Sequence, residues 1–365
     1  MCIKLSVVIP VFNIEDYIGK CLDSVLAQTY QNYEIIVVND GSTDATAAVC
    51  DEYARKDSRI RVIHKANEGV SVARNAGIDV ASGDYFLFFD GDDFMEPYTM
   101  EELCAIANEK QADTVIYGYH RYENGKVKET CYPRFEKELY ENDEIVQQVL
   151  PAFIGLSYDK INDWLNHKKD ALYVENPALW RTMVSAKVIK DNHIRFLPGL
   201  KVGEDTLFIS TYLSYAKRCY VQQKCYYYLV TRETSTIFVY EKKPLQKLEG
   251  KVYQLRARVD LTDDIRKRRN YDINQTWRGT IVMSAIEMAF LLSKKIPGNG
   301  FRKRYQMYLS YAKLPEVEKS VAEFDLKCNM QIKKLPFLLL KRKMYLLLFL
   351  ATTALHLIHY EFNRG

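Results

Sequence analysis

The strongest constraint on the fold is the alternation of strand and helix patterns over the first hundred residues. Continuous β-branched and aromatic runs predict strands at residues 5–13, 33–40, 60–65 and 84–90. Helical patterns separate them: EDYIGKCLDSVLAQT follows the first strand, GSTD begins a helix after the second, and GVSVARNAGIDVAS precedes the fourth. Apolar strands that alternate with helices imply a parallel sheet covered on both faces. We therefore predict an α/β fold.

The remainder of the chain is less regular. ADTVIYGYHRY and CYYYLV predict further strands, with long irregular segments between them, and beyond residue 240 only helical patterns remain. We therefore expect an α/β domain over residues 1–240 and an all-helical region over residues 241–365.

Charge is divided unevenly between these two parts. Residues 241–365 carry a net charge of +13, whereas the first 240 residues carry −9. Such asymmetry suggests an anionic partner for the C-terminal part, such as a membrane surface, a lipid phosphate or a nucleic acid. No RNA- or DNA-binding motif accompanies the basic clusters, so we expect no nucleic-acid partner.

The cysteines and the first residues bear on the cellular compartment. The eight cysteines are scattered and form no CxxC pair, which argues against a zinc ribbon or a dithiol site and favours reduced thiols in a cytosolic protein. The first residues, MCIK, lead into a strand pattern with no cleavage site, so we expect no signal peptide.

An acidic turn follows the fourth predicted strand in FLFFDGDDFMEP. Neighbouring carboxylates repel one another unless a cation or a ligand compensates. Asp90 and Asp92 flank Gly91, and Mg²⁺ or Mn²⁺ commonly binds through one or two carboxylates plus substrate phosphates. Open parallel sheets bind ligands beyond the carboxyl ends of their strands, where this turn is expected. A turn without a ligand is the alternative, because turns are rich in Asp and Gly.

Five stretches, in order, resemble the nucleotide-sugar domain of glycosyltransferase family 2, which has the GT-A fold. They are SVVIPVFN (6–13), VVNDGSTD (37–44), NEGVSVARNAG (67–77), GDYFLFFDGDD (83–93) and GEDTLF (203–208). The resemblance is close through residues 5–100 and patchy to about 240. It implies a Rossmann-like GT-A domain with a mostly parallel central sheet, in which residues 1–100 form the donor half and residues 101–240 the acceptor half.

The resemblance also implies roles for individual residues on the donor side. Asp92 would be the principal metal ligand, assisted by Asp90, which would also lie near the ribose. Asp40 would accept a hydrogen bond from a uracil ring, or alternatively only bond the backbone amides of the GST turn. Arg74 would lie near the base or diphosphate, or alternatively form only a helix salt bridge. The other donor-side residues implied are Pro10, Val11, Asn13 and Gly91.

On the acceptor side, the resemblance makes Asp205 the general base that takes the proton from the acceptor hydroxyl. Glu204 would orient its neighbours or touch the acceptor, although both acids could also serve as helix-start carboxylates. Trp180 would lie beside the acceptor or in the core. Arg232 would bind the diphosphate, but Thr234 stands where a glycine is common in the family.

The implied activity is inverting, Mn²⁺- or Mg²⁺-dependent transfer of a sugar from a nucleoside-diphosphate sugar. UDP-sugars are the expected donors, with GDP- and dTDP-sugars as alternatives, and the acceptor would be a hydroxyl of a glycan or lipid-linked saccharide in bacterial surface-polysaccharide synthesis. The QxxRW motif of processive members is missing, which favours single additions. Two alternatives are a sugar-nucleotide-binding protein without transfer activity and a nucleotidyltransferase. The second should carry a Gly-rich basic loop where PVFNIED stands.

The C-terminal segment 333–360 is apolar beside basic clusters. Its longest uncharged run, residues 344–360, has 17 residues, whereas a spanning helix needs about 20. Basic residues beside an apolar helix suit the anionic cytoplasmic leaflet, so we expect a peripheral protein on the inner face of the cell membrane. The alternative is a helix packed internally against residues 281–292 or across a homodimer.

Overall fold

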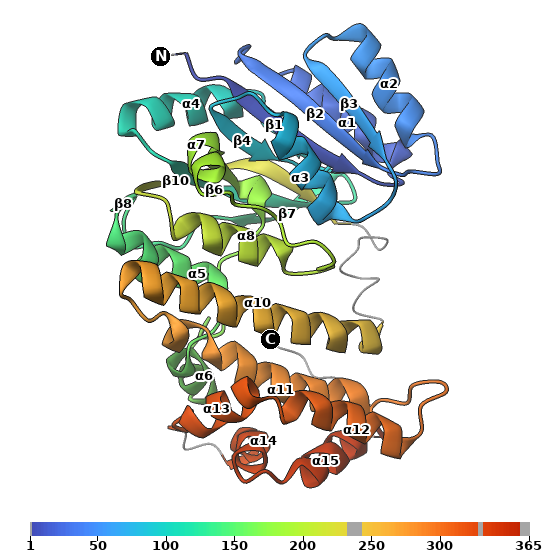
Figure 1. Cartoon of the computed structure of the whole chain (residues 1–365), viewed down its shortest axis with the longest axis vertical. Helices are drawn as coiled ribbons and strands as arrows, with labels where there is room; N and C mark the ends of the chain where they lie inside the picture. Colours follow the sequence, from blue (N-terminus) through green and yellow to red (C-terminus); the bar gives the residue numbers. More distant parts are fainter. Residues whose placement is uncertain (1, 232–242, 328–330, 358–365) are drawn as a thin grey trace. The chain divides into compact units, whose positions relative to one another are not determined.

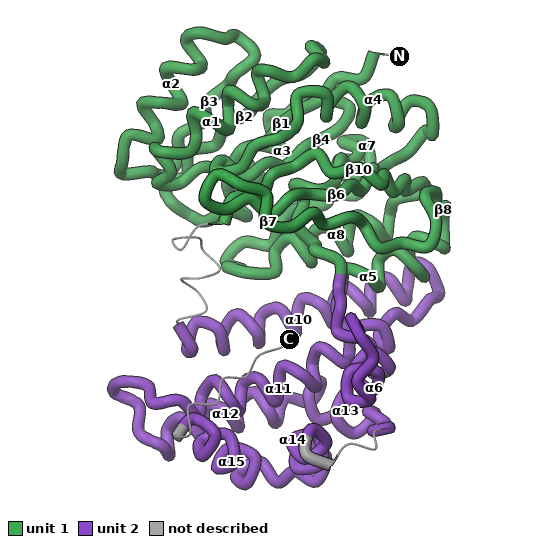
Figure 2. The backbone as a smooth tube through the Cα atoms, turned by 180° about the vertical axis from the view of Figure 1, so that it is seen from behind, with its two compact units in different colours: residues 1–153, 175–235 green, residues 154–174, 236–365 purple. Residues whose placement is uncertain are grey.

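The computed structural model describes residues 2–231, 243–327 and 331–357. The chain forms two compact units, residues 1–153 with 175–235 and residues 154–174 with 236–365 (Figure 2). The segment 154–174 therefore groups with the C-terminal helices, although its sequence gave no reason to separate it from its neighbours.

The four strands predicted from the first hundred residues form one parallel array in the order β3-β2-β1-β4 (Figure 1). Their bounds are Leu5–Val11 for β1, Tyr33–Asp40 for β2, Ile60–Lys65 for β3 and Tyr85–Phe88 for β4. The helices between them are α1 (Glu15–Leu26), α2 (Thr46–Lys56) and α3 (Val70–Val80). The predicted α/β class is confirmed.

Alternate residues of β1 face opposite sides of the sheet. Val7 and Ile9 belong to a buried cluster that includes Leu22 of α1, while Val8 faces α3 on the other side. A Cβ at Gly77 of α3 would lie 2.4 Å from Val8 Cγ1, so this helix approaches the strand too closely for any side chain. The period of two along the strand thus places helices on both faces, as predicted.

The sheet continues beyond β4 with mixed strand directions. β9 (Thr182–Ser185) lies between β4 and β6 (Thr114–Glu123) and is antiparallel to both. β10 (Arg218–Val230) is parallel to β6, and its other edge pairs with β5 (Phe94–Met95). The remaining elements of this unit are α4 (Thr99–Lys110), β7 (Lys126–Cys131), β8 (Leu139–Glu141), the π-helix η1 (Ile145–Val149), α5 (Leu150–Ile154), the 3₁₀ turn η2 (Leu179–Arg181), α7 (Ala186–Asp191) and α8 (Glu204–Leu213).

The second unit is helical, as predicted for the C-terminal region, and is organised around α11 (Arg278–Ser293). This helix is buried on most of its surface and contacts α6, α10, α12, α13, α14 and α15. An α-helix that is apolar all round is expected in such a central place. The bounds of its neighbours are Tyr158–Leu165 for α6, Pro244–Arg269 for α10, Asn274–Thr276 for the 3₁₀ turn η3, Phe301–Ala312 for α12, Pro315–Glu323 for α13, Gln331–Lys341 for α14 and Tyr345–Leu357 for α15.

The C-terminal helix α15 packs on α11 within this unit. Thr352 Oγ1 donates a hydrogen bond to the Ala289 carbonyl at 3.3 Å, and His356 Nε2 lies 2.7 Å from the Phe290 carbonyl. The internal-packing alternative for this segment is therefore confirmed for one face of the helix. None of the helices in the described ranges is long and apolar enough to cross a bilayer.

Candidate active site

The acidic turn after β4 is closed by packing against β1 and α1. The Asp93 amide donates to the Asp90 carbonyl at 3.1 Å, which forms the turn. A Cβ at Gly91 would lie 2.6 Å from Ile14 Cδ1 and 2.9 Å from Val11 Cγ1. A side chain at position 91 would therefore require Ile14 and Val11 to shift. Val11 is 2% exposed and packs against the turn.

Asp93 fastens this turn to the end of β10. The side chain is buried, accepts a hydrogen bond from Tyr227 Oη at 2.6 Å and another from the Val230 amide at 2.7 Å. Tyr227 Oη in turn accepts from the Asp90 amide at 3.2 Å. Burial raises the pKa of Asp93, and the charges of Asp92 and Asp90 raise it further. Sequence reasoning assigned no role to Asp93, because a third acid in the turn carried no signal of its partners on β10.

Arg74 of α3 joins the acidic turn to the start of α8. Its guanidinium contacts Asp205 Oδ1 at 2.7 Å and Glu204 Oε1 at 3.4 Å through Nη1, and Asp90 Oδ1 at 3.1 Å through Nη2. The arginine is 4% exposed, and its guanidinium lies 5.2 Å from the centre of the Phe196 ring. The salt bridge predicted as an alternative for Arg74 is present, but it spans three elements rather than one helix.

Glu204 and Asp205 are the first two residues of α8, after Gly203 with φ of 87°. Burial, followed by the charge of Asp205, raises the pKa of Glu204 to about 8, although Arg74 opposes this shift. Burial also raises the pKa of Asp205, with Arg74 lowering it and Asp90 raising it. Two neighbouring carboxyls with raised pKa values in a polar cluster are typical of acid–base sites.

Asp40 and Asn13 organise the loops at the ends of β2 and β1. Asp40 is 4% exposed and accepts hydrogen bonds from Lys65 Nζ at 2.9 Å and from the amides of Glu68 and Gly69 at 3.0 and 2.8 Å. These amides belong to the loop before α3, not to the GST turn expected from the sequence. A carboxylate offers about four lone pairs, so one remains for a ligand. Asn13, with φ of 50°, accepts from the Thr43 amide at 2.8 Å.

Trp180 lies in the core. It is 4% exposed and stacks with ring centres 4.6 Å apart on Tyr227, the residue that contacts Asp90 and Asp93. Pro10 is half-buried in β1. Arg232 and Thr234 lie outside the described residues.

The two aspartates fit a divalent ion only in part. Asp90 keeps 35% of its side chain exposed while one of its oxygens contacts Arg74. Within the described part of the chain, no group of three or more Asp, Glu, His or Cys side chains is arranged to hold a metal. Mg²⁺ and Mn²⁺ bound through two carboxylates take their remaining ligands from water and substrate phosphates. The turn therefore fits a metal that arrives with a diphosphate.

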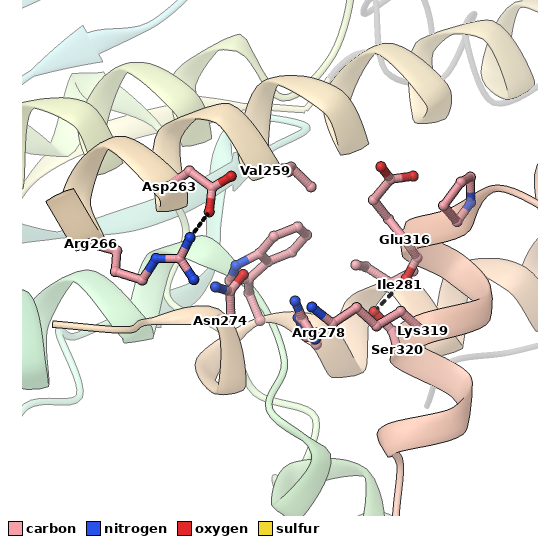
Figure 3. Close-up of a pocket in the computed structure, with 11 residues that line it drawn as sticks. Val259, Asp263, Arg266, Asn274, Arg278, Ile281, Glu316, Lys319 and Ser320 are labelled. Atoms are coloured by element: carbon pink, nitrogen blue, oxygen red, sulfur yellow. Dashed lines mark hydrogen bonds and ion pairs between the residues drawn. The ribbon is translucent and has the colours of Figure 1, made fainter.

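A pocket of about 270 Å³ lies within the helical unit (Figure 3). Its charged side chains are largely paired: Arg266 contacts Asp263 at 3.0 Å, and Arg278 contacts Glu323. The buried Trp277 Nε1 has no hydrogen-bond partner in the described structure. None of the site residues predicted from the sequence lines this pocket.

Comparisons with known proteins match this chain to glycosyltransferases. The family described as "Glycosyl transferase family 2" matches residues 6–165. Glycosyltransferase GlyA of Streptococcus pneumoniae is 33% identical over 63% of this chain and 31% of its own length. The poly(ribitol-phosphate) beta-glucosyltransferase of Bacillus spizizenii is 28% identical over 78% of this chain and 43% of its own. The chain thus spans less than half of either relative.

Solved structures of S. aureus TarS 1–349 share the fold. The complex with UDP has a TM-score of 0.54 and 19% identity, and covers 99% of this chain and 93% of TarS 1–349. A second complex, with UDP-GlcNAc, has the same TM-score of 0.54. The α/β fold and these similarities agree: residues 6–165 match glycosyltransferase family 2, and the relatives named above are glycosyltransferases.

Proposed function

We propose that this protein is an inverting glycosyltransferase that uses a nucleoside-diphosphate sugar. The observation that carries the proposal is the cluster in which Arg74 contacts Asp90 of the acidic turn and Asp205 of α8. The cluster brings two predicted functional groups together. One is the acidic turn, which is predicted to bind the diphosphate, and the other is Asp205, which is predicted to act as the base. The match of residues 6–165 to glycosyltransferase family 2 supports this assignment.

Asp205 is proposed as the general base. It takes the proton from the acceptor hydroxyl while that oxygen forms a bond to the anomeric carbon and the bond from this carbon to the diphosphate oxygen breaks. The electron pair leaves with the nucleoside diphosphate, and the configuration inverts. The raised pKa of Asp205 suits a base, because proton affinity increases with pKa. Glu204, with its pKa raised to about 8, keeps a proton at neutral pH and can donate a hydrogen bond to the acceptor.

UDP-sugars are the proposed donors, since TarS has been crystallised with UDP and with UDP-GlcNAc. Asp92 and Asp90 would hold Mn²⁺ or Mg²⁺, which when bound neutralises charge on the leaving diphosphate. Asp40 would accept from the base through its remaining lone pair. Arg74 keeps Asp90 and Asp205 in fixed positions on either side of the guanidinium.

The proposed acceptor is a hydroxyl of a glycan or lipid-linked saccharide in cell-surface polysaccharide synthesis. The naming of one relative as a poly(ribitol-phosphate) beta-glucosyltransferase supports a polymer of this class. The net charge of +13 over residues 241–365 supports a working place at an anionic membrane surface.

The test is nucleotide release from UDP-, GDP- and dTDP-sugars, measured with Mn²⁺ and with a chelator. We expect turnover of one donor that the chelator abolishes. Asp205→Asn should remove transfer to an acceptor while UDP binding, measured by calorimetry, is retained. Asp191→Asn, which changes a 56% exposed carboxylate of α7, is the matched control and should leave both unchanged. Full transfer by the Asp205 variant would remove it as the base, whereas UDP binding with no turnover of any donor–acceptor pair would favour a binding protein.

A further inference from the structure

The helix α15 exposes a leucine face that nothing in its own unit covers in the described structure. Leu346, Leu347 and Leu350 are 47%, 46% and 45% exposed. At 100° per residue these three positions fall within one 100° sector of the helix. Leu335 of α14 and Met344, between the two helices, are 51% and 42% exposed. The exposed side formed by Leu346, Leu347 and Leu350 is referred to below as the leucine face.

The opposite side of α15 is already occupied. Tyr345, Leu348 and Phe349 are buried, and the Phe349 ring stacks on Tyr308 of α12 with centres 5.7 Å apart. Residues 345–357 contain no Asp, Glu, Lys or Arg. A helix that is apolar all round is normally buried on all sides. Packing on α11 and α12 buries only one side of α15 and leaves the other apolar side exposed.

Basic residues precede α15 in the sequence. Residues 331–357 contain Lys333, Lys334, Lys341, Arg342 and Lys343 and no acidic residue. Lys341 ends α14, and Arg342 and Lys343 form the turn before α15; all three are exposed. Lys343 Nζ contacts Glu318 of α13 at 3.1 Å, and Lys341 Nζ donates to the Phe324 carbonyl. Among the described residues, Arg342 has no ion-pair partner.

The positive charge before α15 distinguishes between two possible partners of the leucine face, a second copy of the chain and an anionic bilayer. A second copy joined by two-fold symmetry would bring the same basic turn towards itself, because isologous interfaces use one patch on both subunits. Like charges across an interface oppose association. An anionic bilayer offers the opposite charge beside a hydrocarbon phase, which suits leucines next to lysines and arginine.

We propose that the leucine face docks on an anionic lipid bilayer, with α15 lying in the interface plane and the turn 341–343 contacting the headgroups. This inference identifies the surface that would carry the membrane association given under the proposed function, and it does not depend on catalysis. Leu346, Leu347 and Leu350 would enter the acyl boundary, while Phe349 and Leu348 keep α15 on the helical unit.

Removal of the whole C-terminal segment would be a poor test, because it would also expose α11 and α12. We would instead replace only exposed side chains with Leu346→Gln, Leu347→Gln and Leu350→Gln. Val127→Gln with Tyr132→Gln, which are 46% and 54% exposed in the first unit, is the matched control. Urea unfolding should give the same midpoint for wild type and both variants.

Binding would be measured by co-sedimentation with vesicles of phosphatidylcholine alone and of phosphatidylcholine mixed with phosphatidylglycerol. We expect wild type to bind only the mixed vesicles and to dissociate as salt rises. The leucine variant should partition roughly 100-fold more weakly, since three half-exposed leucines lose their insertion. The control variant should bind as wild type does.

Failure of wild type to bind the mixed vesicles would overturn the inference, whatever the variants do. Binding that persists in the leucine variant would also overturn it, because charge alone would then suffice. A dimer in sedimentation that the leucine variant abolishes, without vesicle binding, would assign the face to a second copy instead. Vesicle binding without turnover of any donor would leave this inference standing while the proposed function fails.

Discussion

Replacing Arg74 with methionine should strongly destabilise the first unit. The arginine is 4% exposed and contacts the carboxylates of Asp90 and Asp205 at 3.1 and 2.7 Å. It also contacts the carboxyl of Glu204, which keeps a proton at neutral pH, at 3.4 Å. At an effective dielectric of about 20, each unit charge pair near 4 Å is worth about 4 kcal/mol. Desolvation offsets much of that sum, and breaking a buried pair typically costs about 3–5 kcal/mol, which we take as the expected loss in unfolding free energy. Methionine retains an apolar stem against Phe196.

The loss in unfolding free energy of the Arg74→Met variant should depend on pH. Arg74 lowers the pKa values of Glu204 and Asp205, so its removal moves them further above their unfolded values. A carboxyl whose folded pKa is raised loses stability as pH rises above its unfolded pKa, about 4. Wild type already loses stability between the unfolded pKa and its own folded pKa, so the deficit of the variant grows only above the wild-type folded pKa values, and that pKa is about 8 for Glu204. The deficit should therefore be smaller near pH 6 than near pH 9.

Urea unfolding of wild type and variant at several pH values would measure this deficit. Arg195→Met is the matched control, because its pair with Asp79 is 41% and 60% exposed and should contribute less than about 1 kcal/mol. A deficit below about 1 kcal/mol for the Arg74 variant, or one that does not change with pH, would refute the electrostatic account.

Two further predictions concern stability. Gly91→Ala should cost about 1–3 kcal/mol in thermal unfolding, because the new Cβ would lie 2.6 Å from Ile14 Cδ1; an unchanged melting temperature would mean that the turn can move. Burial by itself raises the pKa of Glu34, but hydrogen bonds from Ser6 and Ser82 outweigh it and lower the pKa overall. The stabilisation of the fold that comes from this lowered pKa is present above the unfolded pKa of about 4.3 and is lost as pH falls. Glu34→Gln should therefore cost about 1–2 kcal/mol at pH 7 and progressively less below pH 4, and a deficit that stays constant down to pH 3 would contradict this.

Local pattern was enough to predict the fold class and the positions of the acidic motifs. The strands predicted at residues 33–40 and 60–65 agree with β2 and β3. A β-branched apolar run between two helical patterns is typical of a strand in a parallel sheet whose two faces are covered by helices. The turn at residues 90–93 and the start of α8 were also placed by local chemistry. The predicted roles of Asp92, Asp205 and the nucleotide-side residues stay predictions.

Tertiary structure alone decided which of these side chains meet. Arg74 is separated by 16 residues from Asp90 and by 131 from Asp205, and periodicity reports only that a side chain is polar or apolar, not which distant partner it reaches. The same holds for Asp93 with β10, for β9 between β4 and β6, and for the segment 154–174 within the helical unit. In α15 the sequence determined an apolar helix, while packing on α11 decided which side became buried and left the leucine face exposed.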